Sequence, residues 1–325
     1  MICLGIESTA HTFGAAVIKS KKVLSNVKDS FTTKTGGIIP NKAAEHHIDV
    51  CDEVIQRALK EAKVEMKDIE LVAFSNAPGL GPCLRVGAIA ARSLALANNI
   101  PIIGVNHCIA HLEIGKMLTD AKDPVLLYAS GANTQVIAFD GGKYRIFGET
   151  LDIGVGNLLD SFARHIGLGF PGGPKLDKLS TLSKNYIELP YAVKGMDVSF
   201  GGILTNLKQK FDSGKFKEED LAFSLQETIF AMLLEVSERA MAHCDKNELL
   251  LGGGVACNKR LQEMAHQMCK DRGARCFVPE MQFLVDNAAM IAWLGLLEYK
   301  HGRRQKLEET TIKPYERTDE VDVLW

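Results

Sequence analysis

The sequence lacks the features of several protein classes. None of its eight cysteines belongs to a CxxC pair, which disfavours a zinc ribbon or a disulfide scaffold and favours free thiols. The amino-terminal stretch has no basic segment before its apolar residues, and Glu7 and His11 interrupt it, so we expect no signal peptide. Pro101 and two histidines break the longest uncharged run, which argues against a membrane span. We therefore expect a cytoplasmic protein without a membrane segment.

The chain also lacks an excess of charge. The formal net charge is -2, so the chain as a whole does not attract a polyanion, and an RNA substrate would need a local basic patch or a basic partner. With 325 residues, of which 46% are hydrophobic, the chain is long enough for two lobes with their own cores.

Strand and helix patterns divide the chain into two similar parts. Three β-rich runs separated by turns open the sequence, and the same pattern returns after Pro124. Later strands alternate with amphipathic helices, which is typical of α/β layers. We predict an α/β fold of two lobes, residues 1–124 and 125–325, with a cleft between them and the last helix, near 287–301, at the lobe junction. The other helices are expected near 43–63, 84–98, 107–118, 156–167, 174–183 and 221–244 and directly after Gly254.

The segment HCIAH places His107 and His111 four residues apart in a predicted helix. This spacing puts both imidazoles on one helix face, where they can bind one metal ion, although two unrelated polar residues would give the same pattern. Zinc proteases with this spacing need a glutamate after the first histidine, and Cys108 stands there instead. Asp286 precedes the last helix, where it could be a third ligand, but by itself is more simply an N-cap.

Three turns rich in small residues could bind anions: GIESTAHT, YASGANTQ and LGGGVACN. A further glycine loop spans Thr33 to Pro40. The helix after Gly254 would direct its positive end at a phosphate, and Asn258 in its first turn could bond a ribose or base, or simply face solvent. Asp160 and Asp177 flank a glycine-proline loop that could hold ribose hydroxyls, the alternative being solvated helix residues.

Several motifs together resemble one family across nearly the whole chain. They are NIPIIGVNHCIAHLE, YASGANTQ, GNLLDSFAR, FPGGPKLDKL, KGMDVSF, LLGGGVACNKRL and DNAAMIA. In this order they resemble the catalytic subunit of the KEOPS complex, the archaeal and eukaryotic branch of the tRNA N6-adenosine threonylcarbamoyltransferases. The resemblance implies the two-lobed actin, hexokinase and Hsp70-like (ASKHA) fold, with a nucleotide and metal cleft between the lobes.

The resemblance also implies an activity and a set of site residues. The family transfers a threonylcarbamoyl group from its adenylate to N6 of the adenosine 3′ of the anticodon in tRNAs that read codons beginning with A. One divalent metal, iron or zinc, would be bound by His107, His111 and Asp286, with Tyr128 as a fourth ligand. ATP or threonylcarbamoyl-adenylate would be bound by Tyr128, Ala129, Ser130, Gly131, Ala132, Asp160, Gly173, Asp177 and Asn258.

Partners follow from the same resemblance: a separate small protein kinase/ATPase, a small dimerisation subunit, a kinase-binding regulatory subunit, and tRNA bound mainly by the whole complex. The sequence departs from the family pattern at three places. Asn41 follows GGIIP where an arginine is usual, Asp177 replaces a glutamate, and Gly201 replaces a serine. Two other functions use similar turns: an actin-fold small-molecule phosphotransferase and an ATP-dependent scaffold. No general base stands out, and His11 is a weak candidate.

Overall fold

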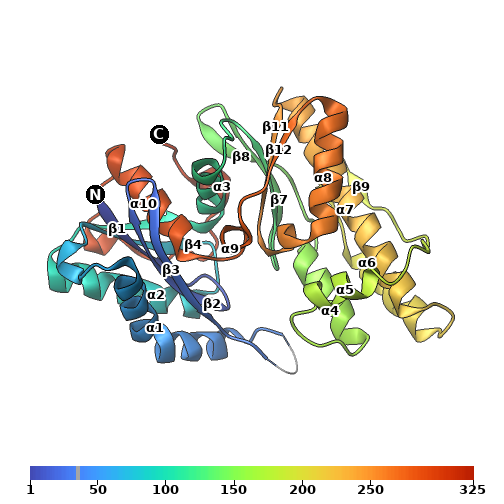
Figure 1. Cartoon of the computed structure of the whole chain (residues 1–325), viewed down its shortest axis with the longest axis horizontal. Coiled ribbons are helices and arrows are strands. Elements are labelled where there is room, and N and C mark those ends of the chain that lie inside the picture. The colour runs from blue at the N-terminus through green and yellow to red at the C-terminus, as the bar shows by residue number, and fades with distance from the viewer. Residues whose placement is uncertain (34–36) are drawn as a thin grey trace.

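The chain folds into two five-stranded sheets, each covered by helices. The computed structural model describes residues 1–33 and 37–325, so part of the predicted Thr33–Pro40 glycine loop lies outside the described residues. In Figure 1 the first sheet with α1, α2 and α10 lies on the left, the second sheet lies near the middle, and α4 to α8 lie to its right. Among the described residues, no helix is long and apolar enough to cross a lipid bilayer.

The first sheet has the strand order β3-β2-β1-β4-β5. Its strands are β1 (Ile2–Glu7), β2 (Thr12–Lys19), β3 (Lys22–Ser30), β4 (Leu71–Ala77) and β5 (Ile102–Asn106). The first three are antiparallel, as expected of a meander, and β4 and β5 extend the sheet in parallel. All of β4 and β5 is buried, because helices cover both faces of this parallel part.

The second sheet repeats this arrangement with the order β12-β11-β6-β7-β8. Its strands are β6 (Val125–Ala129), β7 (Thr134–Asp140), β8 (Lys143–Glu149), β11 (Glu248–Gly252) and β12 (Arg275–Phe277), and a small hairpin joins β9 (Val193–Lys194) to β10 (Asp197–Val198). An antiparallel meander is again extended by parallel strands. The predicted internal repeat and α/β class are confirmed.

The helices match the predicted ones closely, with three differences. They are α1 (Pro40–Ala62), α2 (Gly81–Asn98), α3 (His107–Leu118), α4 (Val155–His165), α5 (Gly173–Ser180), α6 (Gly201–Asp212), α7 (Glu218–His243), α8 (Lys259–Arg272), α9 (Met281–Leu284) and α10 (Ala288–Lys300). Helices α6 and α9 were not predicted. The expectation that a helix follows Gly254 directly was wrong, because a 3-10 turn, Gly254–Cys257, intervenes before α8.

Helix α10 returns the chain to the first sheet. Its buried residues pack with those of β1, β2 and β4, and both chain ends lie in the left half of Figure 1. The approach is close because Gly5 has no side chain: a Cβ there would lie 2.4 Å from the Ala288 carbonyl oxygen and 2.5 Å from the Ala292 nitrogen. Because α10 packs so closely on the sheet, the loop before it, which carries Asp286, is fixed over the first sheet. The division into lobes at residue 124 stays a prediction.

The close packing at Gly5 predicts a large effect of one methyl group. Gly5→Ala should lower the free energy of unfolding by about 1–3 kcal/mol or more, because the obstacle is backbone that cannot rotate away. Urea unfolding measures this. The matched control is Gly202→Ala in α6, where a Cβ would meet nothing within 4 Å; it should be neutral or slightly stabilising. Equal stability of the two variants would contradict this account of α10 packing.

Candidate metal and nucleotide site

Helix α3 presents the two histidines. It begins at His107 because Asn106 caps it: the Asn106 side-chain oxygen accepts hydrogen bonds from the backbone N–H groups of Cys108 and Ile109. His107 and His111 lie one turn apart, with ring centroids separated by 4.8 Å. Both side chains are buried, 4% and 3% exposed, so neither is a solvated surface histidine.

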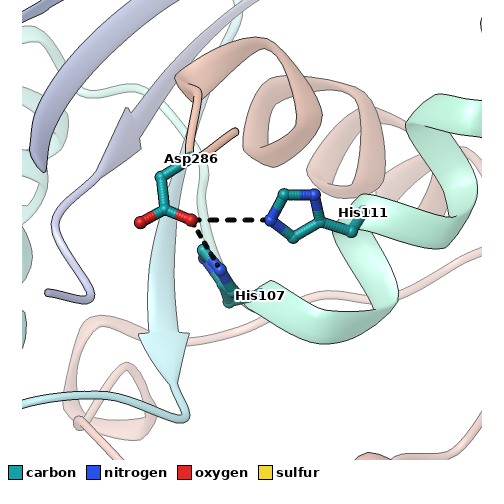
Figure 2. A group of neighbouring side chains, drawn as sticks. All are labelled: His107, His111 and Asp286. Atoms are coloured by element: carbon teal, nitrogen blue, oxygen red, sulfur yellow. Dashed lines mark ion pairs between the residues drawn. The ribbon is translucent and has the colours of Figure 1, made fainter. Parts of the chain in front are cut away.

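Asp286 meets both histidines from the other end of the chain. One oxygen, Oδ1, lies 3.4 Å from His107 Nε2 and 3.6 Å from His111 Nε2, and Figure 2 shows both rings directed at it. The interpretation of Asp286 as a plain N-cap was wrong. The cap of α10 is the next residue, Asn287, whose side chain accepts a hydrogen bond from the Met290 backbone N–H.

Glu7 is a partner of His107 that the sequence analysis missed. It lies fully buried at the end of β1, and its Oε2 is 2.9 Å from His107 Nδ1. Its other oxygen accepts hydrogen bonds from the backbone and side chain of Thr9, which fixes the carboxylate. A carboxylate that accepts from Nδ1–H leaves Nε2 free for a metal, which is the usual second partner of a metal-binding histidine. The GIEST motif alone indicates an anion-binding turn and gives no sign of this contact.

Burial and neighbouring charges shift the pKa values of the two histidines in opposite directions. Burial alone lowers the pKa of His107, but the Glu7 carboxylate and Asp286 outweigh it and raise that pKa well above its ordinary value. Burial lowers the pKa of His111, and Asp286 only partly opposes this. Burial raises the pKa of Asp286, yet the two imidazoles, 3.4 and 3.6 Å from its Oδ1, bring that pKa well below its ordinary range. At neutral pH the Asp286 carboxylate is therefore ionised, and the His111 imidazole beside it is neutral.

A metal ion fits this group of residues. Within the described parts of the chain, neither ring nitrogen of His111 has a hydrogen-bond partner, although both are buried, and such orphaned atoms are costly unless something binds them. One ligand atom from each of His107, His111 and Asp286 lies within 4.8 Å of the others. The Tyr128 hydroxyl is 3.2 Å from His107 Nε2. Two imidazoles and a carboxylate suit Zn²⁺ or Fe²⁺ and leave positions open.

The turn after β6 packs against neighbouring backbone. Ser130 N and Oγ both donate to the Asn133 carbonyl, and its own carbonyl accepts from Gly156 N at the start of α4. Gly131 and Ala132 are exposed at the tip. The glycine turn after β11 packs against the end of β6. Gly253 has φ +88°, and a Cβ there would lie 2.3 Å from the Ala129 carbonyl oxygen. Only glycine fits this contact.

The other predicted nucleotide residues form side-chain contacts in the second half of the chain. Asp160 Oδ1 accepts from Gly172 N at 2.7 Å, just before Gly173 begins α5. Asn258 donates from Nδ2 to Asp177 Oδ1 at 3.0 Å, and its side-chain oxygen caps α8. Asn258 is therefore an N-cap and not a first-turn residue. The structure brings these residues into one region, and their role as nucleotide contacts stays a prediction.

Asp152 holds the unpredicted helix α6 in place. It accepts hydrogen bonds from the backbone N–H groups of Ile153, Phe200 and Gly201, which outweigh burial and lower the pKa of Asp152 to about 2. No local sequence pattern predicts this contact, because the carboxylate and the start of the helix are far apart in sequence.

His47, to which the sequence analysis gave no role, is buried, and its Nε2 lies 3.1 Å from the Ala10 carbonyl oxygen.

The Glu7–His107 contact predicts a change in metal affinity. Glu7→Gln should weaken binding of Zn²⁺ by about 10–100-fold, measured by competition with a chelator. In the wild type the apparent affinity should rise with pH as His107 releases its proton, and Glu7→Gln should make this rise shallower, because a neutral amide no longer stabilises that proton. The control is Glu45→Gln, an exposed glutamate of α1. A Glu7→Gln affinity equal to the control's would contradict the role of Glu7.

Comparisons with solved structures support the fold. Over 92% of this chain, HypF of T. kodakarensis superimposes with a TM-score of 0.66 at 14% identity, covering 48% of that chain. The activator of 2-hydroxyisocaproyl-CoA dehydratase from Clostridium difficile, solved with bound ADPNP, covers 94% of this chain and 100% of its own at a TM-score of 0.57 and 12% identity. At these identities the likeness concerns the fold alone, which is the two-lobed actin-like architecture.

Sequence comparisons identify the family. Residues 22–293 match the profile of TsaD, tRNA N6-adenosine threonylcarbamoyltransferase. The protein of that name from Thermococcus kodakarensis is 58% identical over 325 residues, 100% of both chains, and that from Archaeoglobus fulgidus is 52% identical, also over 100% of both. A probable bifunctional tRNA threonylcarbamoyladenosine biosynthesis protein from Methanothermobacter thermautotrophicus is 53% identical over 100% of this chain and 61% of its own. The chain belongs to the tRNA N6-adenosine threonylcarbamoyltransferase family.

Proposed function

We propose that the chain transfers a threonylcarbamoyl group from threonylcarbamoyl-adenylate to N6 of the adenosine 3′ of the anticodon, forming N6-threonylcarbamoyladenosine in tRNAs that read codons beginning with A. The observation that carries the proposal is the convergence of His107, His111 and Asp286 on one point in a chain of this family. Neither a phosphotransferase nor a scaffold would need two buried imidazoles beside one carboxylate.

His107, His111 and Asp286 would hold one divalent metal, iron or zinc, with the Tyr128 hydroxyl as a fourth ligand. When bound, the metal would supply Lewis-acid stabilisation of negative charge that develops on the donor. With the metal bound, Glu7 would accept a hydrogen bond from His107 Nδ1–H and leave Nε2 for the ion. Burial keeps water away from the imidazoles and strengthens each charge interaction there.

The second half of the chain would hold the adenylate. The exposed amides of Gly131 and Ala132 can donate to its phosphate, because small residues let the backbone approach an anion. Asp160 and Asp177 would bond the ribose hydroxyls, with Gly173 and Asn258 beside them. In the reaction the N6 amine attacks the carbamoyl carbon, the bond from that carbon to the phosphate oxygen breaks, and AMP leaves with the electron pair. His11, in the turn after β1, is the candidate acceptor of the N6 proton.

Partner proteins would supply the rest of the activity in the cytoplasm. A net charge of -2 predicts weak binding of tRNA by this chain alone. The bifunctional relative extends well beyond the region that this chain matches, so in that protein a second activity accompanies this region. We propose a small protein kinase/ATPase, a small dimerisation subunit and a regulatory subunit that binds the kinase, in the manner of the KEOPS complex.

Substitution of the histidines tests the proposed function. His107→Ala and His111→Ala should each lower the rate of N6-threonylcarbamoyladenosine formation by about 100-fold or more, since an interaction worth about 3 kcal/mol in the transition state is lost. The assay uses the chain with its partners, tRNA and the donor, with detection of the nucleoside by mass spectrometry. His266→Ala, at an exposed position of α8, is the control and should be unaffected.

Other outcomes would separate the alternatives. Wild-type rates in both histidine variants would rule out the metal-centred site and favour a scaffold. A purified chain that retains no transition metal but phosphorylates a small molecule with Mg²⁺ would favour the phosphotransferase.

A further inference from the structure

A row of three residues crosses the first sheet beneath the start of α10. Glu7 of β1 pairs with Gly14 of β2, and Gly14 pairs with Lys28 of β3. Directly paired residues point to the same face of a sheet. A Cβ at Gly14 would lie 3.4 Å from the Cβ of Ala288, so the shared face is the one that α10 covers. Lys28 therefore projects from the same face as Glu7, the partner of His107.

The ends of this row have different environments. Glu7 is buried and bonded to His107, whereas Lys28 is exposed and, among the described residues, has no carboxylate oxygen within 4.0 Å of its ammonium group. Asp29, the next residue along β3, cannot neutralise it, because neighbouring residues of a strand point to opposite faces and Asp29 is paired with His46. Lys28 is thus a free cation on the face that carries the metal-binding group.

Distance and charge place the Lys28 ammonium at the rim of the site. Two strand spacings, about 10 Å, separate the backbone of Lys28 from that of Glu7. The flexible Lys28 side chain can extend about 6 Å from its own backbone. Burial lowers the pKa of Lys28, whereas proximity to the Asp286 carboxylate and to the Cys257 side chain raises it. Asp286 lies in the metal-binding group, and Cys257 follows the glycine turn after β11. Lys28 is therefore close enough to both groups to interact with them electrostatically, which places it beside the candidate metal-binding group.

We propose that Lys28 binds an oxyanion of the donor, its phosphate or its threonyl carboxylate, at the rim of the His107, His111 and Asp286 site. The assignment rests on the proposed function, which supplies a donor with both anions. An ammonium there matches either group as a point charge and orients the carbamoyl carbon between the two halves of the chain.

Substitution of Lys28 tests the proposal with the full chain and its partners. Lys28→Ala should raise the KM for threonylcarbamoyl-adenylate by about 10-fold or more, as expected for the loss of one charge-assisted contact, with a smaller change in kcat. Lys28→Arg should restore most of the affinity, and Lys28→Glu should be worse than Lys28→Ala. The control is Lys22→Ala, at an exposed lysine on the same strand that has no ion-pair partner among the described residues; its KM should match the wild type.

Two binding measurements identify which anion is bound. Calorimetry with AMP reports the phosphate alone: weaker AMP binding by Lys28→Ala assigns the contact to the phosphate. A donor in which the threonyl carboxylate is a methyl ester reports the other group: if wild type and Lys28→Ala bind it equally, the contact is to the carboxylate. A donor Kd within twofold of the wild type would overturn the proposal, as would a raised KM for tRNA with an unchanged KM for the donor.

Failure of the proposed function would look different. If the wild-type complex formed no modified tRNA but bound the donor, the transferase assignment would be wrong, while calorimetry of the donor with wild type and Lys28→Ala would still decide the role of Lys28. Thermal unfolding of the variants checks that the fold is unchanged, as expected for an exposed side chain.

Discussion

One buried group of charges determines how this site is built: the His107 imidazole between the carboxylates of Glu7 and Asp286. Removing one partner of a buried ion pair typically costs about 3–5 kcal/mol, because the other charge is left uncompensated. The three residues come from the first strand, the third helix and the loop before the last helix. Their pairing therefore requires β1, α3 and the start of α10 to lie together, and the same requirement assembles the ligands.

The packing of α10 converts this requirement into fixed geometry. Gly5 lets the helix backbone lie directly on the sheet, and Asn287 sets the residue at which the helix begins. Asp286 precedes that cap, so it is held outside the helix with both carboxylate oxygens uncommitted to backbone N–H groups of the first turn. A substitution that displaces α10 on the sheet would also move Asp286 away from both imidazoles. The geometry of the His107, His111 and Asp286 group is thus linked to the packing of α10 on the first sheet.

The sequence predicted those parts of the molecule that depend on local patterns. The spacing of His107 and His111, the two meanders and most helices follow from periodicities of two and 3.6 residues. The role of Glu7 could not be predicted, because a glutamate at a strand end has no local signature and its partner is a hundred residues away. Asp286 and Asn287 are both good caps, and only packing decides between them. Helix α6 was missed because Asp152, whose carboxylate accepts hydrogen bonds from the backbone N–H groups at the start of that helix, is distant in sequence.

Charge balance connects the metal-binding group with the cation proposed at its rim. Without a bound cation, two carboxylates outnumber the positive charge that one imidazole can carry, so the site would repel a donor with a phosphate and a carboxylate. A divalent ion bound through neutral imidazoles would offset both carboxylates and leave the site close to neutral. Lys28, whose ammonium has no ion-pair partner among the described residues, would then make the local charge positive. An anionic donor would be attracted by this local charge, although the chain as a whole is slightly acidic.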